Sequence, residues 1–418
     1  MTAPLPVSVR EVGYATAGSG SSWWSSVEDE ATPELRWPLS VGVYDRMRRQ
    51  DAQAASVLRA VTLPIRRTTW SIDRAGAPEE VARFVAENLG LPLQGAQLDP
   101  APRTRDRFSW AEHLQQALLA IIYGHMFFEQ VYRIAPDGRA WLRKLAPRLP
   151  QTLSAINVAR DGGLVSIEQY APVGSRARSV TIRVDRLVAY VHEREGGNWL
   201  GQSLLRSAYK HWLLKDRALR TWAQVIERNG LGVPVYTATE DGGDFEAGKK
   251  MAQDFRSGPT AGGAKPFGSD LELLGVKGTL PNAENFVRYQ DEQIGRSVLA
   301  HFLNLNAQGG SYALASVQAD TFVQSLQALA QQIADTATQH IVEDLVDVNF
   351  GPDVPAPRVT FQEIGSRNAV TAEALRLLMD AGVLDPNDPA LRRFARETFG
   401  IPDSETPPTP AAGSEESS

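Results

Sequence analysis

Hydrophobic positions along the chain recur with two different spacings, which divide the sequence into helices and strands. Apolar residues three and four positions apart lie on one face of a helix, and this pattern predicts helices over 44–62, 78–89, 110–123, 203–228, 245–256, 283–302, 316–348, 371–379 and 390–399. Period-two alternation, or a short apolar run between turn residues, is typical of strands; it predicts strands over 66–74, 127–134, 141–145, 152–157, 164–170, 180–190, 232–237, 271–276 and 358–363. This mixed order predicts an α+β fold.

Capping and turn residues support several of these boundaries. Pro78 is placed to begin one helix and Gly90 to end it, as proline favours the first turn and glycine the position after the last. Ser109 is placed to cap the helix that follows it. The turn sequences at 136–138 and 161–163 separate strands that we expect to pair as hairpins.

The predicted helix 203–228 is basic and also carries aromatic residues. A lone basic helix usually exposes its charged side chains to solvent, but Trp212 and Trp222 favour packing between neighbouring copies of the chain. We therefore name these two tryptophans as candidate interface residues.

The predicted helix 316–348 is long, with an apolar stripe and few charges in its first half. A helix of this length crosses a whole body or lines an interface. Two interpretations stay open, the core of a helical bundle and an oligomer interface. For the second interpretation, the candidate residues are Phe322, Leu326 and Leu329.

Both ends of the chain differ in composition from the middle. Residues 1–33 are rich in glycine and serine over 13–30, which predicts a flexible arm. Trp23 and Trp24 interrupt that arm, and they would either pack partly on the body or anchor the arm on a neighbouring subunit. The segment 402–418 has almost no large apolar residue and is expected to be disordered.

Composition excludes several classes of protein. The 418 residues include 43 Lys and Arg against 49 Asp and Glu, which gives a formal charge of −6. This charge does not suit a protein that binds nucleic acid through a basic surface. The absence of cysteine excludes disulfides and thiolate metal sites. No apolar run approaches the roughly 20 residues of a membrane span, and the first 20 residues lack the apolar stretch of a secretory signal.

Catalytic motifs are equally scarce. Gly243–Lys249 fits the spacing of a phosphate-binding loop, but Lys250 stands where Ser or Thr would hold magnesium, and Asp244 and Glu246 oppose a phosphate. We interpret it as the solvated start of a helix. The six histidines form no tight ligand pair, and no carboxylate pair stands out. The sequence therefore predicts no enzyme, no metal and no cofactor.

A set of short motifs in a fixed order resembles the portal proteins of tailed phages, and most closely the Mu-like portal family. The stretch GQSLLRSAYKHW at 201–212, followed by Lys215, Trp222 and the segment 227–234, resembles the family's signature. Supporting similarities lie at 37–47, 51–59, 64–72 and 309–318. The resemblance covers roughly 34–365.

The resemblance implies a ring of about twelve subunits, each with a mixed α/β wing, a helical stem, a small clip and a short crown. It places the wing at 34–240, stem helices at 241–256 and 281–304, and the clip at 257–280 between them. It places a tunnel loop at 305–314, a long helix with a return strand at 315–365 and the crown at 366–401.

Two of these segments hold the implied functional residues. The tunnel loop would face DNA with small neutral groups that slide past phosphates, namely Asn306, Gln308, Gly309, Gly310 and Ser311. The clip would dock the packaging motor through Lys265, Phe267, Leu271, Leu273, Val276 and Lys277.

The implied function is the channel for DNA packaging and ejection at a capsid vertex. The implied partners are further copies of the chain, the large terminase subunit, a coat or scaffold protein, a head–tail adaptor and double-stranded DNA bound without sequence specificity. The implied location is the virion, after assembly in the host cytoplasm, with no membrane. Another head–tail connector or minor capsid protein is the first alternative. A nucleotide-using enzyme built on Gly243–Lys249 is the second.

Overall fold

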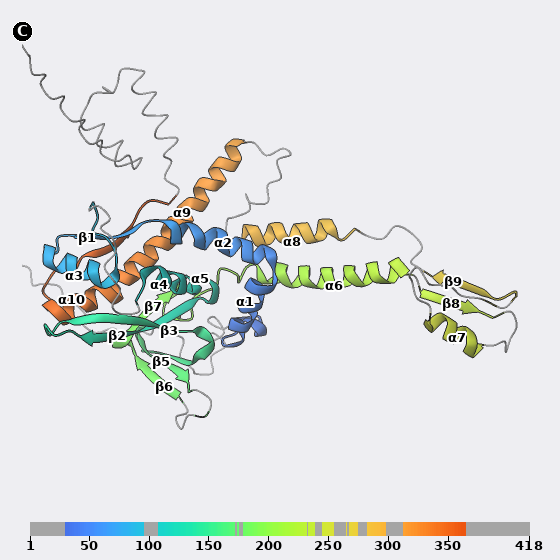
Figure 1. Cartoon of the computed structure of the whole chain (residues 1–418), viewed down its shortest axis with the longest axis horizontal. Coiled ribbons are helices and arrows are strands. Elements are labelled where there is room, and N and C mark those ends of the chain that lie inside the picture. The colour runs from blue at the N-terminus through green and yellow to red at the C-terminus, as the bar shows by residue number, and fades with distance from the viewer. Residues whose placement is uncertain are drawn as a thin grey trace, which may run out of the picture. The chain divides into compact units, whose positions relative to one another are not determined.

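The computed structural model describes residues 30–95, 108–171, 174, 179–231, 233–238, 245–254, 265, 267–274, 282–297 and 312–364 (Figure 1). The chain divides into two compact units, Met1–Gln362 and Glu363–Ser418. Of the second unit only residues 363 and 364 are described. Residues 1–29 of the arm, 305–311 of the tunnel loop, the crown helices and the tail lie outside the described residues, whereas residues 312–314 of the expected tunnel loop are helical.

The first unit is a mixture of helices and short antiparallel sheets, as the sequence predicts. Its helices are α1 (Leu39–Gln50), α2 (Ala52–Arg67), α3 (Glu79–Leu89), α4 (Trp110–Ala117), α5 (Leu119–Tyr123), α6 (Tyr209–Leu231), α7 (Phe245–Asp254), α8 (Glu284–Arg296), α9 (Tyr312–Ala337) and α10 (Glu343–Phe350). Its strands are β1 (Trp70–Asp73), β2 (His125–Ile134), β3 (Ala140–Arg148), β4 (Leu153–Val158), β5 (Leu164–Tyr170), β6 (Ser179–Arg183), β7 (Leu187–Val191), β8 (Val233–Thr237), β9 (Asp270–Leu274) and β10 (Arg358–Phe361).

Two three-stranded sheets form the centre of the α/β body. In the first, β2 pairs with β3 on one side and β7 on the other. All five residues of β7 are buried, because α9 packs against this strand. In the second sheet the order is β4-β5-β6. Phe127 of the first sheet packs with Leu153, Ile167 and Ile182 of the second, so one core joins both sheets.

A second core joins the N-terminal helices to the bases of α6 and α8. Met47 of α1, Ala54 of α2 and Tyr123 of α5 lie in one buried cluster with Trp212 of α6 and Ile294 of α8. Trp212 stands near the start of α6 and Ile294 near the end of α8, so the two helices run antiparallel from this core, side by side (Figure 1).

The helix that follows residue 281 packs on α6, and α7 packs on β8. The expected stem helices 241–256 and 281–304 are therefore not neighbours of each other in this packing. The cause is a close approach between α7 and β8, where Gly248 lies directly against the ring of Tyr236. Strands β8 and β9 pair antiparallel, so β8, α7 and β9 form a small α/β unit between α6 and α8 in the chain.

Four predicted elements are interrupted in the structure. The helix 44–62 breaks at Asp51, which separates α1 from α2. The strand 180–190 is broken by a 3-10 turn, η4 (Val184–Arg186), which separates β6 from β7. The helix 110–123 divides at Leu118 into α4 and α5. The helix 316–348 contains a π-helical turn, η6 (Thr338–Val342), between α9 and α10. Backbone breaks of this kind depend on tertiary contacts, which apolar spacing does not record.

Candidate functional site

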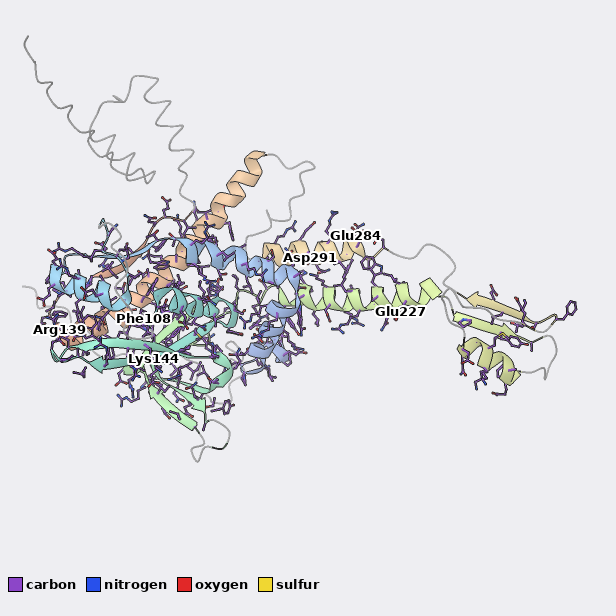
Figure 2. The ribbon with its side chains drawn as sticks, in the orientation of Figure 1. Phe108, Arg139, Lys144, Glu227, Glu284 and Asp291 are labelled. Carbon is purple, nitrogen blue, oxygen red and sulfur yellow. The ribbon has the colours of Figure 1, made fainter. Side chains whose placement is uncertain are left out.

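Three charged side chains join α2, α6 and α8 beside the second core. Lys215 Nζ of α6 lies 2.9 Å from Asp51 Oδ2 and 2.6 Å from Asp291 Oδ1 of α8; Figure 2 labels Asp291 on the side of α8 that faces α6. Asp51 also accepts the amide of Ala54 at 2.9 Å and thereby caps α2. One lysine therefore ties the base of the helix pair to the body.

The electrostatics of this cluster keep Lys215 charged. Burial acts to lower the pKa of Lys215, because it removes water from the ammonium group. Hydrogen bonds and attraction from Asp291 and Asp51 outweigh burial, so the pKa of Lys215 is raised. Loss of the lysine would leave two neighbouring carboxylates without their cation, which is the costly way to break a buried ion pair.

A second polar contact lies one turn away on the same two helices. His211 Nδ1 of α6 lies 2.8 Å from Gln290 Oε1 of α8. The His211 ring also meets the Tyr289 ring edge to face, with centroids 6.4 Å apart. Together with Lys215, these contacts fix both the rotation and the register of α8 on α6.

Beyond these contacts, α6 and α8 expose large apolar side chains. Leu219 is 40% exposed and Ile226 is 59% exposed. Their seven-residue separation places them on the same face of α6, two turns apart. On α8, Phe286 and Tyr289 are also exposed. The His211 ring covers part of Tyr289, while the remaining surface of Tyr289 and of the other three side chains is accessible to a partner.

The π-helical turn in the long helix is a second structurally specific site. The side-chain amide of Gln130 on β2 donates to the carbonyl oxygen of His340 and to Asp344 Oδ2, both at 2.7 Å. The backbone amide of Ala189 on β7 donates to His340 Nδ1 at 3.3 Å. A π-turn releases a helix carbonyl for an outside donor, and here that donor anchors the long helix on the central sheet.

The candidate interface residues fall into two groups, and three of them need correction. Trp212, Phe322 and Leu326 are buried within their own chain, so they are core residues that present no surface to a neighbour. Trp222 and Leu329 are half-buried and keep part of their surface. Apolar spacing predicts that such residues are covered, and it does not distinguish coverage by the same chain from coverage by another copy.

The candidate clip residues are only partly described. Phe267 is fully exposed, and Lys265 forms an exposed ion pair with Asp270 at 2.8 Å. Leu271 and Leu273 belong to β9 and pair with Tyr236 and Pro234 of β8. Val276 and Lys277 lie outside the described residues, as do all five candidate tunnel-loop residues, Asn306, Gln308, Gly309, Gly310 and Ser311.

The phosphate-loop motif has a packing explanation at its second glycine. Gly248 lies inside α7, and a Cβ atom there would come within 2.0 Å of the Tyr236 ring. The glycine thus allows α7 to approach β8, while Lys249 is exposed. Backbone amides inside a helix are already bonded and cannot cradle an anion as a helix N-terminus does.

Buried histidines are the remaining titratable groups of note. Burial lowers the pKa of His113 to about 3 and that of His125 to about 4. His113 Nε2 lies 2.9 Å from the Tyr190 hydroxyl, and His125 Nδ1 lies 2.9 Å from the carbonyl oxygen of Leu200. Both are neutral core histidines. Among the described residues, no group of three potential ligands could hold a metal ion, and no helix is long and apolar enough to span a membrane.

Asp291 and Asp344 were not predicted from the sequence, and Asp51 and Lys215 were named only as parts of motifs that resemble the family. A signal for Asp51 was present, since an aspartate directly before the helix 52–67 is a typical N-cap. No local signal indicates that Asp51, Lys215 and Asp291 converge, because they come from three separate helices.

Comparison with known proteins adds family and fold information. The family model described as "Portal protein of Mu bacteriophage" matches residues 41–401. A chain in the virion of a native gene transfer agent particle matches with a TM-score of 0.54 and 12% identity, covering 87% of this chain and 93% of that chain.

Two further matches come from the necks of gene transfer agent particles. In the empty particle, computed with C6 symmetry, the TM-score is 0.55 and the identity 13%, covering 86% of this chain and 94% of that chain. In the native particle, computed with C12 symmetry, the TM-score is 0.53 and the identity 12%, with coverages of 86% and 93%. At these identities the similarity shows a shared fold.

Proposed function

The chain belongs to the family of Mu bacteriophage portal proteins, and from that membership we propose that about twelve copies close into a ring that carries double-stranded DNA through one vertex of a capsid. The observation that carries the proposal is the extent of the family match. It spans the α/β body, the α6–α8 pair and the β8-α7-β9 unit in one continuous stretch. The twelvefold neck with the same fold supports the subunit number.

The stem of this portal is formed by α6 and α8, joined by Lys215, in place of the pair expected from the sequence. The clip is the β8-α7-β9 unit and the segment that connects it to α8. The wing is the α/β body that contains the two central sheets. The tunnel loop is the part of the expected segment 305–314 that precedes α9, which begins at Tyr312, and the crown at 366–401 keeps the position given by the resemblance.

Neighbouring subunits contact each other through the exposed apolar faces of α6 and α8. A closed ring uses two different faces of each subunit, one for each neighbour. Leu219 and Ile226 of α6 supply one contact surface, and the exposed Phe286 of α8 supplies the other.

The channel carries DNA without gripping it. The chain is acidic overall, with a formal charge of −6, and at physiological salt such repulsion acts over a Debye length of about 8 Å. The tunnel-loop sequence at 306–311 contains no lysine or arginine that could hold a phosphate. Weak contacts of this kind permit sliding, whatever the base sequence.

The exposed clip is the docking site for the packaging motor, the large terminase subunit, and later for a head–tail adaptor. Phe267 is the strongest candidate contact in the described part of the clip, because a fully exposed phenylalanine is costly in water. The wing contacts the coat or scaffold protein. Assembly takes place in the host cytoplasm, and the finished ring resides in the virion. The role is structural and requires no cofactor.

The decisive experiment measures the mass and the end-on symmetry of the assembled particle. Mass photometry and negative-stain microscopy are applied to the purified chain and to the chain expressed with its coat and scaffold proteins. A ring of about twelve subunits with an open centre wide enough for duplex DNA is expected. Monomers alone under both conditions would overturn the proposal. A ring that assembles but binds no terminase would favour another head–tail connector.

A further inference from the structure

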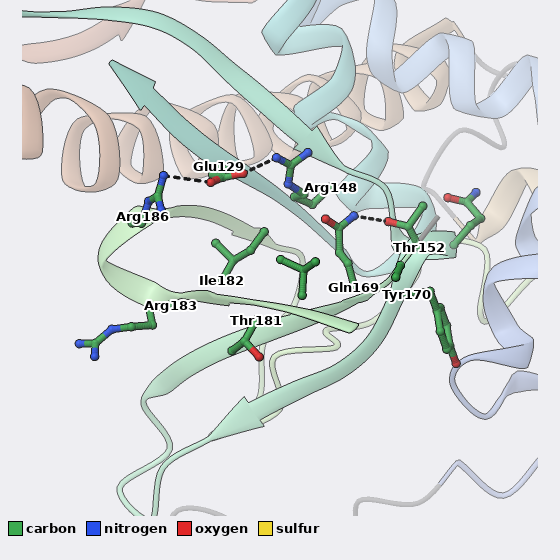
Figure 3. A pocket seen from close by; sticks show the side chains of 12 residues that line it. Glu129, Arg148, Thr152, Gln169, Tyr170, Thr181, Ile182, Arg183 and Arg186 are labelled. Carbon is green, nitrogen blue, oxygen red and sulfur yellow. Dashed lines mark hydrogen bonds and ion pairs between the residues drawn. The ribbon is translucent and has the colours of Figure 1, made fainter. Parts of the chain in front are cut away.

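A cleft lies between the two central sheets of the described part of the chain. It has a volume of about 660 Å³ and is lined by Glu129 and Arg148 on one side and by strand β6 on the other, with the end of β5 and the η3 turn (Pro150–Thr152) beside them (Figure 3). No part of the proposed portal function uses this cleft.

The cleft combines an apolar patch with excess positive charge. Tyr170 is 60% exposed and Val180 is 47% exposed, and both line it. Three arginines also line it, and two of them, Arg148 and Arg186, share the single carboxylate of Glu129. The buried Nε of Arg148 has no hydrogen-bond partner among the described residues. The lining therefore suits an occupant with aromatic and acidic groups.

One strand edge is also open along the cleft. β6 pairs with β5 on one side, and in the described residues no strand pairs with its other side. An extended peptide adds readily to such an edge, with backbone hydrogen bonds for affinity and side-chain pockets for specificity. The occupant that fits best is therefore an extended, aromatic and acidic segment.

The chain itself contains such a segment directly before the first described residue. Residues 21–29 read SSWWSSVED, with two tryptophans followed by two acids. The next residue, Glu30, is held by Arg206 through contacts of 2.5 Å and 2.6 Å. Nine extended residues reach at most about 30 Å from that point.

The start of the described chain is connected to the cleft through packed elements. Helix α1, which follows shortly after Glu30, contacts the η3 turn. The side-chain amide of Gln151 in that turn donates to the Tyr123 hydroxyl at 3.0 Å, and this hydroxyl donates to Asp45 of α1 at 2.8 Å. Gln151 itself lines the cleft, so α1, the first α-helix after Glu30, is joined by contacts to one end of it.

We propose that this cleft binds the segment 21–29, with Trp23 and Trp24 seated on Tyr170 and Val180 and with Glu28 facing the arginines. Tryptophan buries a large apolar area and also stacks well on guanidinium groups. The bound segment comes from the same chain, because α1, which follows the held residue Glu30, contacts the η3 turn at one end of the cleft.

The first test is disulfide cross-linking in the full chain, which has no cysteine of its own. Ser25→Cys is combined with Thr181→Cys, since Thr181 is exposed and lines the cleft. In the control, Ser25→Cys is combined with Glu87→Cys, because Glu87 is exposed on α3 and does not line the cleft.

The cleft pair is expected to oxidise at least about ten times faster than the control pair, because binding raises the effective concentration of the two thiols. A cross-linked monomer with altered mobility supports the proposal. A covalent ladder would assign the segment to a neighbouring copy and would overturn it, as would equal rates for the two pairs.

The second test asks whether the tryptophans and the charges hold the segment. In the cross-linking background, Trp23→Ala with Trp24→Ala should slow oxidation about tenfold, whereas Ser21→Ala with Ser22→Ala should leave the rate unchanged. Arg186→Glu should also slow oxidation, and adding Glu28→Lys should restore it. An oxidation rate that is unchanged both by the tryptophan substitutions and by the charge reversal would overturn the assignment. Circular dichroism verifies that each variant is folded.

Discussion

Lys215 Nζ of α6 lies 2.6 Å from Asp291 Oδ1 of α8, and the same ammonium group lies 2.9 Å from Asp51 of α2. In the proposed portal, this is the point where the stem joins the wing. A rigid joint there matters because forces applied at the clip reach the capsid through α6 and α8. The cluster stands beside the core around Trp212 and Ile294, where apolar packing supports it.

Replacement of Lys215 by methionine tests this joint. The variant leaves two carboxylates without their cation, and breaking a buried ion pair in this way costs about 3–5 kcal/mol. The free energy of unfolding in urea should fall by about that amount. Lys210→Met is the matched control, since Lys210 is exposed on the same helix and should change stability by less than about 0.5 kcal/mol. Equal effects at both positions would contradict the role of the cluster.

Acid should destabilise the wing through its buried histidines. Burial lowers the pKa of His113 to about 3, while an unfolded histidine titrates near 6.5. Below pH 6.5 the unfolded state binds a proton at His113, whereas the folded state does not. The contribution of neutral His113 to the free energy of unfolding is therefore complete above pH 6.5 and is lost as the pH falls towards 3. The loss for one such histidine is about 2 kcal/mol at pH 5.

The measurement is the urea unfolding free energy at pH 7 and at pH 5. His113→Gln should lose about 2 kcal/mol less between these values than the parent chain. Tyr190→Phe removes the hydroxyl 2.9 Å from His113 Nε2 but keeps the histidine, so its pH dependence should match the parent. An unchanged slope in His113→Gln would show that other groups govern acid stability.

The apolar face of α6 should control ring closure without affecting the fold. Ile226→Asp places a charge where the proposed interface buries an isoleucine, a side chain worth about 1.5–3 kcal/mol on burial. Mass photometry should show fewer closed rings at micromolar concentration, with unchanged circular dichroism. Ile134→Asp is the control, because Ile134 is exposed on β2 and outside the stem. Normal rings from Ile226→Asp would remove this face from the interface.

The sequence predicted the order of elements well, because that order depends on local periodicity. The hairpin of β2 and β3, the strand β9 and the helix α6 all occur close to their expected ranges. The pairing of β1 with β10 could not be expected, since Trp70 and Phe361 meet from opposite ends of the described chain. The spacing of apolar residues does not indicate which distant segments of the chain will contact each other.

The candidate site was harder to predict, because burial does not reveal the covering partner. Trp212 and Phe322 were expected at an interface, yet both are covered by their own chain. The packing of α7 was hard to predict for a related reason. A short amphipathic helix such as α7 can pack on a strand or on another helix, and only the contact of Gly248 with Tyr236 shows which one it meets.

Gly248 should be essential for the clip unit. In Gly248→Val the new side chain would begin 2.0 Å from the Tyr236 ring, so α7 must move away from β8 or the ring must rotate. Amide hydrogen exchange over β8 and β9 should accelerate at least about tenfold, which corresponds to about 1.4 kcal/mol. Lys249→Ala, on an exposed neighbour, should leave exchange unchanged. Adding Tyr236→Ala to Gly248→Val should restore part of the protection; a variant with normal exchange would contradict the packing role.

The tunnel loop should affect DNA transport but not ring formation. Deletion of residues 308–311 removes two glycines together with small polar groups, and it leaves the α6–α8 pair and its exposed faces intact. Rings should therefore form normally by mass photometry, while the amount of DNA packaged per capsid should fall. Replacing residues 308–311 by four alanines is the control for loop length. The amount of DNA that this variant packages should lie between those of the deletion and the parent chain, because the replacement restores the length of the loop but not its flexible glycines. Packaging that stays normal in the deletion would show that DNA passes without help from this loop.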